Sequence, residues 1–214
     1  MYHIDKLAIE LRIRSTNIGD IMITTTSLAI AHWNYFLALE QDLENISRFI
    51  EFDDKNFGCF SIEIARVLLA STSEVDVVCK QLCQAINSAS KATKIKAYCD
   101  EITAAFPNMI DFQIRMPRYG LAFTPWVNWR EKKAPDWWKA NNKIKHERDS
   151  QYHQGNLKNA LNSVAALFIM ILYLYKEKAE RGELVPAPQL MRVQDSHYSD
   201  VIYNPYDKGI MYKL

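Results

Sequence analysis

The sequence predicts an all-α fold: an antiparallel bundle of about five helices, with an irregular insertion rich in proline and tryptophan and an extended C-terminal tail. Three observations lead to this prediction. Apolar residues recur at three- and four-residue steps over long stretches. The longest apolar run, Val164 to Tyr175, has 12 residues, which is too short to cross a bilayer and favours a buried helix. The composition, 49% hydrophobic and 24% charged, is ordinary for a folded chain.

Chain length and cysteine usage limit the class of protein. At 214 residues the chain can bury a core without disulfides or metals, and we expect a single domain over residues 1–214. The 4 cysteines form no CxxC pair and are predicted to be buried thiols. The N-terminal stretch "MYHIDKLAIELRIR" mixes charges with apolar residues and lacks the apolar run of a secretory signal. These features favour a reduced, cytoplasmic protein.

Three helices are predicted in the first half of the chain. Residues 27–51 and 60–90 both place large apolar side chains on one helical face, with acidic residues between them. The hydroxyl-rich residues 71–73 predict a bend in the second helix. A third helix, over about 91–106, should stop at Pro107, because a proline disfavours helical geometry in the residue before it.

The second half alternates irregular and helical segments. Residues 107–135 are rich in proline and aromatic residues and predict an irregular insertion with room for short strands. A fourth helix is expected over 136–146, which opens with an aspartate suited to a helix N-terminus. Asn156 can cap a fifth helix that runs to about residue 178 and forms the centre of the core. The helical core is thus expected over 27–178.

The two ends of the chain give weaker patterns. Residues 182–214, rich in proline and tyrosine, are expected to be an extension that lies against the surface or a partner. The β-branched stretch "DIMITTTS", residues 20–27, predicts a short strand. Its partner in a sheet is expected to be "SDVIYN", residues 199–204, or "GIMYKL", residues 209–214.

Charge and motif content narrow the candidate functions. The net charge of +1 gives no overall attraction to nucleic acid, so such a partner needs a local basic patch. No glycine-rich phosphate loop, GxSxG elbow, HExxH motif or paired zinc cysteines occur. Residues 125–154 do carry a local excess of lysine and arginine together with four tryptophans. These residues can bind phosphates and stack on unpaired bases, or the tryptophans can be core residues and the lysines solvated.

The polar stretch "NKIKHERDSQYHQ", residues 142–154, is the strongest candidate for a site. His146 and His153 flank Arg148 in it. An imidazole that titrates near neutrality beside a fixed cation can take a proton from a ribose 2′-hydroxyl while the phosphate charge is neutralised. The simpler interpretation is a solvated connection between two helices.

The order of elements resembles a known superfamily. Two long amphipathic helices, an acidic "SEVD" in the second, and "NNKIKHERDSQYHQGNLKNALNSVAALF" opening a strongly apolar last helix are similar to the HEPN superfamily over roughly residues 27–178. HEPN domains are small and all-helical, and they often act as RNA-cleaving toxins and anti-phage defence effectors. The resemblance implies a metal-independent endoribonuclease that dimerises, so that an arginine and a following histidine of each copy meet in one cleft. There the histidine acts as base and the arginine holds the phosphate.

Two registers of this arginine-histidine motif fit the chain. Arg148 and His153 match it literally. In the family, however, the motif closes the penultimate helix, where His146 is the better-placed histidine and Asn141 stands in place of the arginine. In that register Lys145 or Arg148 supplies the cation, or the site binds RNA without cutting it.

The resulting candidate residues are, for catalysis, His146, Arg148, His153 and Lys145, and, for substrate binding, Asn142, Lys143, Asp149 and Glu74. Neither a metal nor a cofactor is expected. The expected partners are RNA, a second copy of the chain in a homodimer and a cognate regulator protein, with no membrane. The alternative function is a non-catalytic RNA-binding or protein-interaction module, such as an antitoxin or a sensor. A purely structural protein would tolerate replacement of Lys145, His146 and Arg148.

Overall fold

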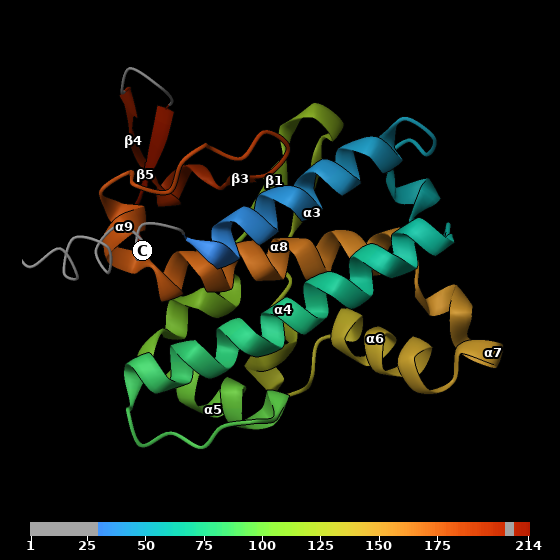
Figure 1. Ribbon diagram of the computed structural model, residues 1–214, viewed down its shortest axis with the longest axis horizontal. Coiled ribbons are helices and arrows are strands. Elements are labelled where there is room, and N and C mark those ends of the chain that lie inside the picture. Colours follow the sequence, from blue (N-terminus) through green and yellow to red (C-terminus); the bar gives the residue numbers. More distant parts are fainter. Residues whose placement is uncertain (1–29, 204–207) are drawn as a thin grey trace, which may run out of the picture. The chain divides into compact units, whose positions relative to one another are not determined.

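Helices α4 (Ile62–Ile86) and α8 (Leu157–Leu174) lie side by side at the centre of the protein (Figure 1). Asn156 caps α8 as predicted, because its side chain accepts a hydrogen bond from a backbone N–H of the first turn. At the contact between the two helices, the buried hydroxyls of Ser71 and Ser163 lie 2.6 Å apart. Small residues at this point let the helices approach closely.

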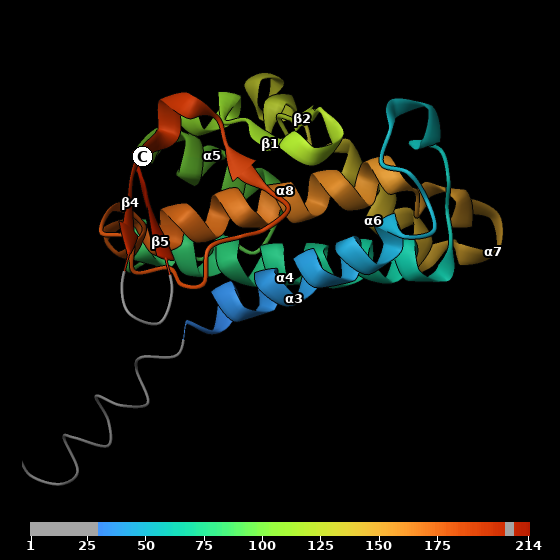
Figure 2. The same ribbon diagram turned by 90° about the horizontal axis from the view of Figure 1, so that it is seen from above.

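Helix α3 (Ala31–Ser47) packs against this pair (Figures 1 and 2). Trp33 and Phe36 are fully buried and contact Phe168 of α8, with ring centroids 5.8 and 4.7 Å apart. The computed structural model describes residues 30–203 and 208–214. The start of the first predicted helix therefore lies outside the described residues, and its end comes earlier than expected.

Helices α5 (Ile95–Ala105) and α6 (Asp136–His146) pack on α4, and α6 also reaches α8. The bounds of α6 match the prediction, and α5 ends before Pro107 as expected but begins later than residue 91. Helix α4 continues without interruption through residues 71–73, where a bend was predicted.

Short helices complete the helical part. α7 (Arg148–Gln151) follows α6, and α9 (Lys176–Glu180) follows α8 after a break at Tyr175, where a single fifth helix was expected. The 3-10 turns are η1 (Asp54–Asn56), η2 (Pro107–Asp111), η3 (Pro117–Tyr119), η4 (Val127–Glu131), η5 (Tyr152–Gln154) and η6 (Asp195–His197).

Two small antiparallel sheets make the protein mainly α rather than all-α. The strands are β1 (Ile114–Met116), β2 (Leu121–Phe123), β3 (Arg192–Val193), β4 (Tyr198–Tyr203) and β5 (Lys208–Tyr212). The first sheet has the order β2-β1-β3, with Ile114 opposite both Phe123 and Val193. Gly120, at φ 64°, makes the turn that joins β1 to β2. These strands are too short for alternation along the sequence to reveal them.

The C-terminal segment is part of the core, which corrects the expectation of a surface extension. Leu184, Met191 and Tyr212 are at least 98% buried. The indole of Trp33 donates a hydrogen bond to the backbone oxygen of Pro186 at 3.1 Å. Within the second sheet β4 pairs with β5, while the predicted strand at 20–27 lies outside the described residues.

The tryptophans of the insertion are core residues. Trp126, Trp129 and Trp137 are at most 3% exposed. The indole N–H of Trp126 donates to the backbone oxygen of Ala166 in α8 at 3.3 Å. Because these three rings fill the space between the insertion, α6 and α8, they are not free to stack on bases. Trp138 alone of the four is half-buried.

Helix α8 is a core helix, as predicted from its apolar composition. By length and composition it could cross a membrane, but 78% of it is buried inside the protein, as in the core of a soluble protein. Cys79, Cys83 and Cys99 are buried as predicted, whereas Cys59 is partly exposed, which corrects the prediction for that thiol. Burial raises the pKa of the Cys83 thiol to about 12, so this cysteine is a core residue rather than a nucleophile.

Candidate functional site

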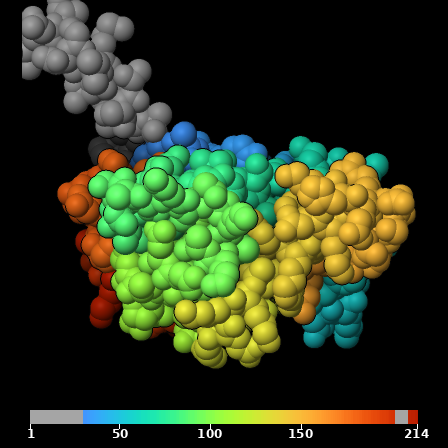
Figure 3. All heavy atoms as spheres, turned by 90° about the horizontal axis from the view of Figure 1, so that it is seen from below, coloured from blue at the N-terminus to red at the C-terminus, as the bar shows by residue number. Residues whose placement is uncertain are grey.

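A cleft of about 450 Å³ lies between α4 and α6, and we call it the α4–α6 cleft. It is lined by Leu69, Thr72, Ser73 and Asp76 of α4, by Trp138, Asn141, Asn142 and Lys145 of α6, and by Arg148 of α7. Each helix contributes residues at the spacing i, i+3, i+4 and i+7, which is one face of a helix. Figure 3 shows the side of the molecule on which the α4–α5 and α6–α7 parts of the chain reach the surface.

The packing of α6 on the core decides which of its residues reach the cleft. Trp137, Ala140 and Ile144 are buried toward the protein interior. The face one residue further along, from Trp138 to Lys145, is thereby turned toward α4. A helix with the same polar residues at other spacings would present them to solvent.

The floor of the cleft is polar and buried. Thr72 is 2% exposed, and its hydroxyl oxygen has no hydrogen-bond partner among the described residues. Asn141 is 8% exposed, and its side-chain amide has one long hydrogen bond, of 3.4 Å, to the side-chain oxygen of Asn142. Buried polar groups are ordinarily satisfied, so this floor is suited to a ligand that supplies the missing partners.

The rim of the cleft is positively charged. Lys145 and Arg148 are exposed, and within the described part of the chain neither forms an ion pair. The carboxylate of Asp76 is already engaged by Lys80 and by the hydroxyl of Tyr98, which donates to it at 2.9 Å. Burial and the Asp76 carboxylate raise the pKa of Tyr98, so this hydroxyl stays protonated. The two cations are therefore available to an anion.

Arg148 also borders a second groove, of about 520 Å³. This groove is lined by Tyr35, Ile62, Ala65, Arg66, Leu69, Ala70, Ser73, Arg148 and Tyr152. The Arg148 guanidinium lies 6.0 Å from the centre of the Tyr152 ring. Arg148 thus stands between a polar cleft and a more apolar groove, with Leu69 and Ser73 common to both.

Gly155 holds this part of the chain against α4. A Cβ at position 155 would lie 2.8 Å from the Cβ of Ala65 in α4. The adjacent backbone N–H of Leu157 donates to the backbone oxygen of Cys59 at 2.8 Å. Because the segment from α7 to α8 is fixed here, the position of Arg148 beside the cleft depends on this close approach.

Gly155→Ala is therefore expected to lower the free energy of unfolding by about 1–3 kcal/mol, since the new methyl group overlaps a rigid helix. Chemical denaturation measures the change. Gly58→Ala is the matched control, because nothing lies within 4 Å of a Cβ there. Equal stability of the two variants would show that the Gly155 contact does not constrain the segment.

The structure places the predicted site residues in two groups. Lys145, Arg148 and Asn142 line the α4–α6 cleft. The other predicted residues are absent from its lining: His146, His153, Lys143, Asp149 and Glu74. Both histidines are exposed, and the Nε2 of His153 lies 2.9 Å from the side-chain nitrogen of Gln154. Glu74 instead meets His32 of α3, with 2.5 Å between its oxygen and the imidazole Nδ1.

Sequence reasoning missed several residues of the cleft. Thr72 and Ser73 were interpreted only as part of a bend, and Asp76 only as part of the acidic "SEVD" stretch. Whether Trp138 packs in the core or against a base was left open. The available signal was the shared spacing of polar residues in α4 and α6. Among the described residues, no group of three or more histidine, cysteine, aspartate or glutamate side chains is placed to hold a metal ion.

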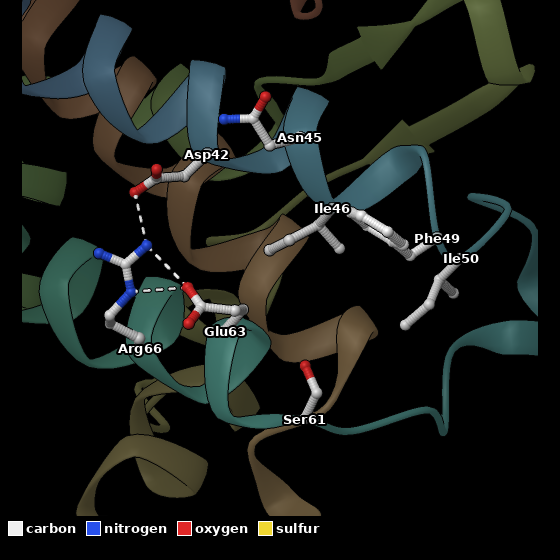
Figure 4. Close-up of a pocket in the computed structure, with 8 residues that line it drawn as sticks. All are labelled: Asp42, Asn45, Ile46, Phe49, Ile50, Ser61, Glu63 and Arg66. Atoms are coloured by element: carbon white, nitrogen blue, oxygen red, sulfur yellow. Dashed lines mark hydrogen bonds and ion pairs between the residues drawn. The ribbon is translucent and has the colours of Figure 1, made fainter.

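Another cavity, of about 340 Å³, lies between the end of α3 and the start of α4 (Figure 4). Its apolar side is formed by Ile46, Phe49 and Ile50. Its one cation, Arg66, is neutralised by Glu63 at 2.8 Å and Asp42 at 3.6 Å. This cavity therefore lacks the available positive charge of the α4–α6 cleft, which is the better candidate for an anionic ligand.

Comparisons with known proteins do not identify a relative. The sequence matches no family model and no curated protein, and no solved structure matches the fold.

Proposed function

We propose that this chain is a cytoplasmic RNA-binding protein of the HEPN type, which binds its RNA in the α4–α6 cleft. The observation that carries the proposal is that two cations, Lys145 and Arg148, lie at the rim of a polar cleft without an ion-pair partner in the described part of the chain. RNA supplies phosphates for the cations and hydrogen-bonding bases for the polar floor. The low net charge of the chain makes such a local patch necessary for RNA binding.

Metal-independent cleavage of the RNA is the second candidate function. It is favoured by the exposed His146 and His153, which flank Arg148 in the chain. One imidazole would take the proton from the 2′-hydroxyl, whose oxygen attacks phosphorus, while the P–O5′ bond breaks and the 5′-oxygen receives a proton from the other imidazole. The products are a 2′,3′-cyclic phosphate and a 5′-hydroxyl. If the chain cleaves RNA, its cellular role would be that of a toxin or defence effector controlled by a cognate regulator protein.

The position of the histidines favours binding over cleavage within one copy of the chain. Neither imidazole lines the cleft that holds the cations, and in the His146 register Asn141 occupies the place where the HEPN motif has its arginine. Cleavage therefore requires a homodimer in which a second copy brings an imidazole to the cleft.

Binding is tested by fluorescence anisotropy with a short labelled single-stranded RNA, measured between about 50 and 200 mM salt. The wild type should bind RNA, and affinity should fall as salt rises. The double variant Lys145→Ala, Arg148→Ala should bind more weakly, and the slope of log affinity against log salt should shrink by about 1.4, since each phosphate contact on a single strand contributes roughly 0.7.

The matched control removes the same two charges elsewhere. Arg130 and Lys133 are exposed and paired with Asp111 and Glu131, so Arg130→Ala, Lys133→Ala should change binding little. An equal loss of affinity in both double variants would show that RNA binding depends on the overall positive charge of the protein, and it would contradict binding in the α4–α6 cleft.

Cleavage is tested by incubation with total and transfer RNA in EDTA. If the second candidate is correct, wild type cuts, His146→Ala or His153→Ala abolishes cutting, and the products carry cyclic phosphate ends. If the wild type binds RNA but does not cleave it, the RNA-binding function stands and the nuclease function is contradicted.

A further inference from the structure

Burial changes in steps from the floor of the α4–α6 cleft to its rim. Thr72 and Asn141, both uncharged, are 2% and 8% exposed. Trp138 is half-buried beside them, and the two cations Lys145 and Arg148 are exposed. A ligand that matches this order has an uncharged, hydrogen-bonding end that enters the protein and an anionic end that stays at the rim.

Thr72 gives independent evidence for a ligand at the floor. A serine or threonine within a helix commonly satisfies its hydroxyl on a backbone oxygen of the preceding turn. The neighbouring Ser71 does so, with its hydroxyl 2.8 Å from the backbone oxygen of Val67. The Thr72 hydroxyl is equally buried and has no such bond among the described residues. A buried hydroxyl that lines a cleft and lacks a protein partner among the described residues is suited to hydrogen-bond a group that binds there.

Asn141 complements this hydroxyl. Its side-chain oxygen and nitrogen offer an acceptor and a donor side by side, and among the described residues their one protein partner is Asn142, at the long distance of 3.4 Å. A nucleobase edge presents donors and acceptors in the same plane and at the same spacing. The volume of about 450 Å³ lies within the usual range of small-ligand sites, which is about 300–1,000 Å³.

We propose that the cleft holds one unpaired nucleotide of the RNA strand, a proposal that rests on the RNA binding proposed above. The base edge meets Thr72 and Asn141, the base lies beside the indole of Trp138, and the phosphate is held by Lys145 and Arg148. The base must be unpaired, because in a duplex its edge is already hydrogen-bonded and its faces are stacked. The substrate class is therefore single-stranded RNA or an RNA loop.

The two parts of the cleft should contribute differently to recognition. Cations bind the phosphates of every sequence alike, whereas a hydroxyl and an amide on a base edge distinguish one base from another. Loss of the Thr72 hydroxyl should therefore change the base preference, while loss of Lys145 and Arg148 should lower the affinity for RNA of every sequence.

The experiment compares labelled oligo(A), oligo(C) and oligo(U) RNAs, and the oligo(A)·oligo(U) duplex, by fluorescence anisotropy. Thr72→Val replaces the hydroxyl by a methyl group of similar size, and Thr72→Ser keeps the hydroxyl. We expect Thr72→Val to lower the affinity for at least one single-stranded RNA about tenfold, and to lower the affinities for the three strands by different factors. The dependence of affinity on salt should not change. Thr72→Ser should bind like the wild type, and the duplex should bind at least about tenfold more weakly than the best single strand.

Thermal unfolding of the free variants separates binding from folding. Because Thr72→Val removes a hydroxyl that has no hydrogen-bond partner among residues 30–203 and 208–214, its melting temperature should equal or exceed that of the wild type. Normal RNA binding by Thr72→Val, or duplex binding equal to that of single strands, overturns the nucleotide pocket and leaves RNA binding at the rim intact. No binding of any RNA by the wild type overturns the proposed function itself.

Discussion

Phe168→Ala is expected to lower the free energy of unfolding by about 3–5 kcal/mol. Phe168 is fully buried in α8 and stacks on Phe36 of α3 at 4.7 Å between ring centroids. Its ring also contacts Trp33, and Tyr212 of β5 meets it edge-on at 6.1 Å. Truncation removes a ring that joins α3, α8 and β5, and it leaves a cavity among buried neighbours.

Chemical denaturation with linear extrapolation measures this loss. Phe49→Ala is the matched control, because Phe49 is 87% exposed and its replacement should change stability by no more than about 0.5 kcal/mol. A loss below about 1 kcal/mol for Phe168→Ala would mean that the core closes around the missing ring, and that α3 is held mainly by other contacts.

The long helices were predictable because their evidence is local. Apolar residues at helical spacing and a capping Asn156 identify α8 without knowledge of what it packs against. The small sheets were not predictable in the same way. β1 pairs with β3, so residues 114 and 193 meet although nothing near either in the sequence signals the other. A strand of three residues or fewer carries too little alternation to be recognised alone.

The candidate site was predictable in its charges and not in its floor. Lys145 and Arg148 were identified from the local excess of charge in the sequence. Both are exposed in the folded protein, so their charges are available as that excess suggested. Thr72 and Trp138 come from helices that meet in the folded protein, so their proximity depends on how α4 and α6 pack. The C-terminal segment was wrongly predicted to lie on the surface. Its apolar residues are scattered along the sequence, and their burial depends on contacts with α3.

Glu40 of α3 is the residue that ties the C-terminal segment to the core. Its carboxylate is 4% exposed and accepts hydrogen bonds from the backbone N–H groups of Gln189, Leu190 and Met191, at 2.7–2.8 Å. Three consecutive backbone donors on one carboxylate explain how a segment without regular structure is held at one position. The carboxylate supplies the partners that a helix or sheet would otherwise provide.

Glu40→Ala is expected to lower the free energy of unfolding by about 3 kcal/mol, because backbone donors that are buried lose their acceptor. Glu44→Ala, one turn further along α3 and half-exposed, is the matched control and should change stability by no more than about 0.5 kcal/mol. Equal losses in both variants would show that the hydrogen bonds from residues 189–191 to the Glu40 carboxylate do not account for the effect.

The pH dependence of stability gives a second measurement of the same residue. Burial raises the pKa of Glu40 above its ordinary value of 4.5, while the three backbone N–H groups oppose this shift. A carboxyl whose pKa is higher in the folded state binds its proton more tightly there, so the folded state is favoured at low pH. The contribution of Glu40 should therefore be fully present below about 4.5 and should decline as pH rises through its folded-state pKa. Glu40→Gln should lack this decline, and an identical pH profile in both proteins would show that the pKa of Glu40 does not differ between the folded and unfolded states.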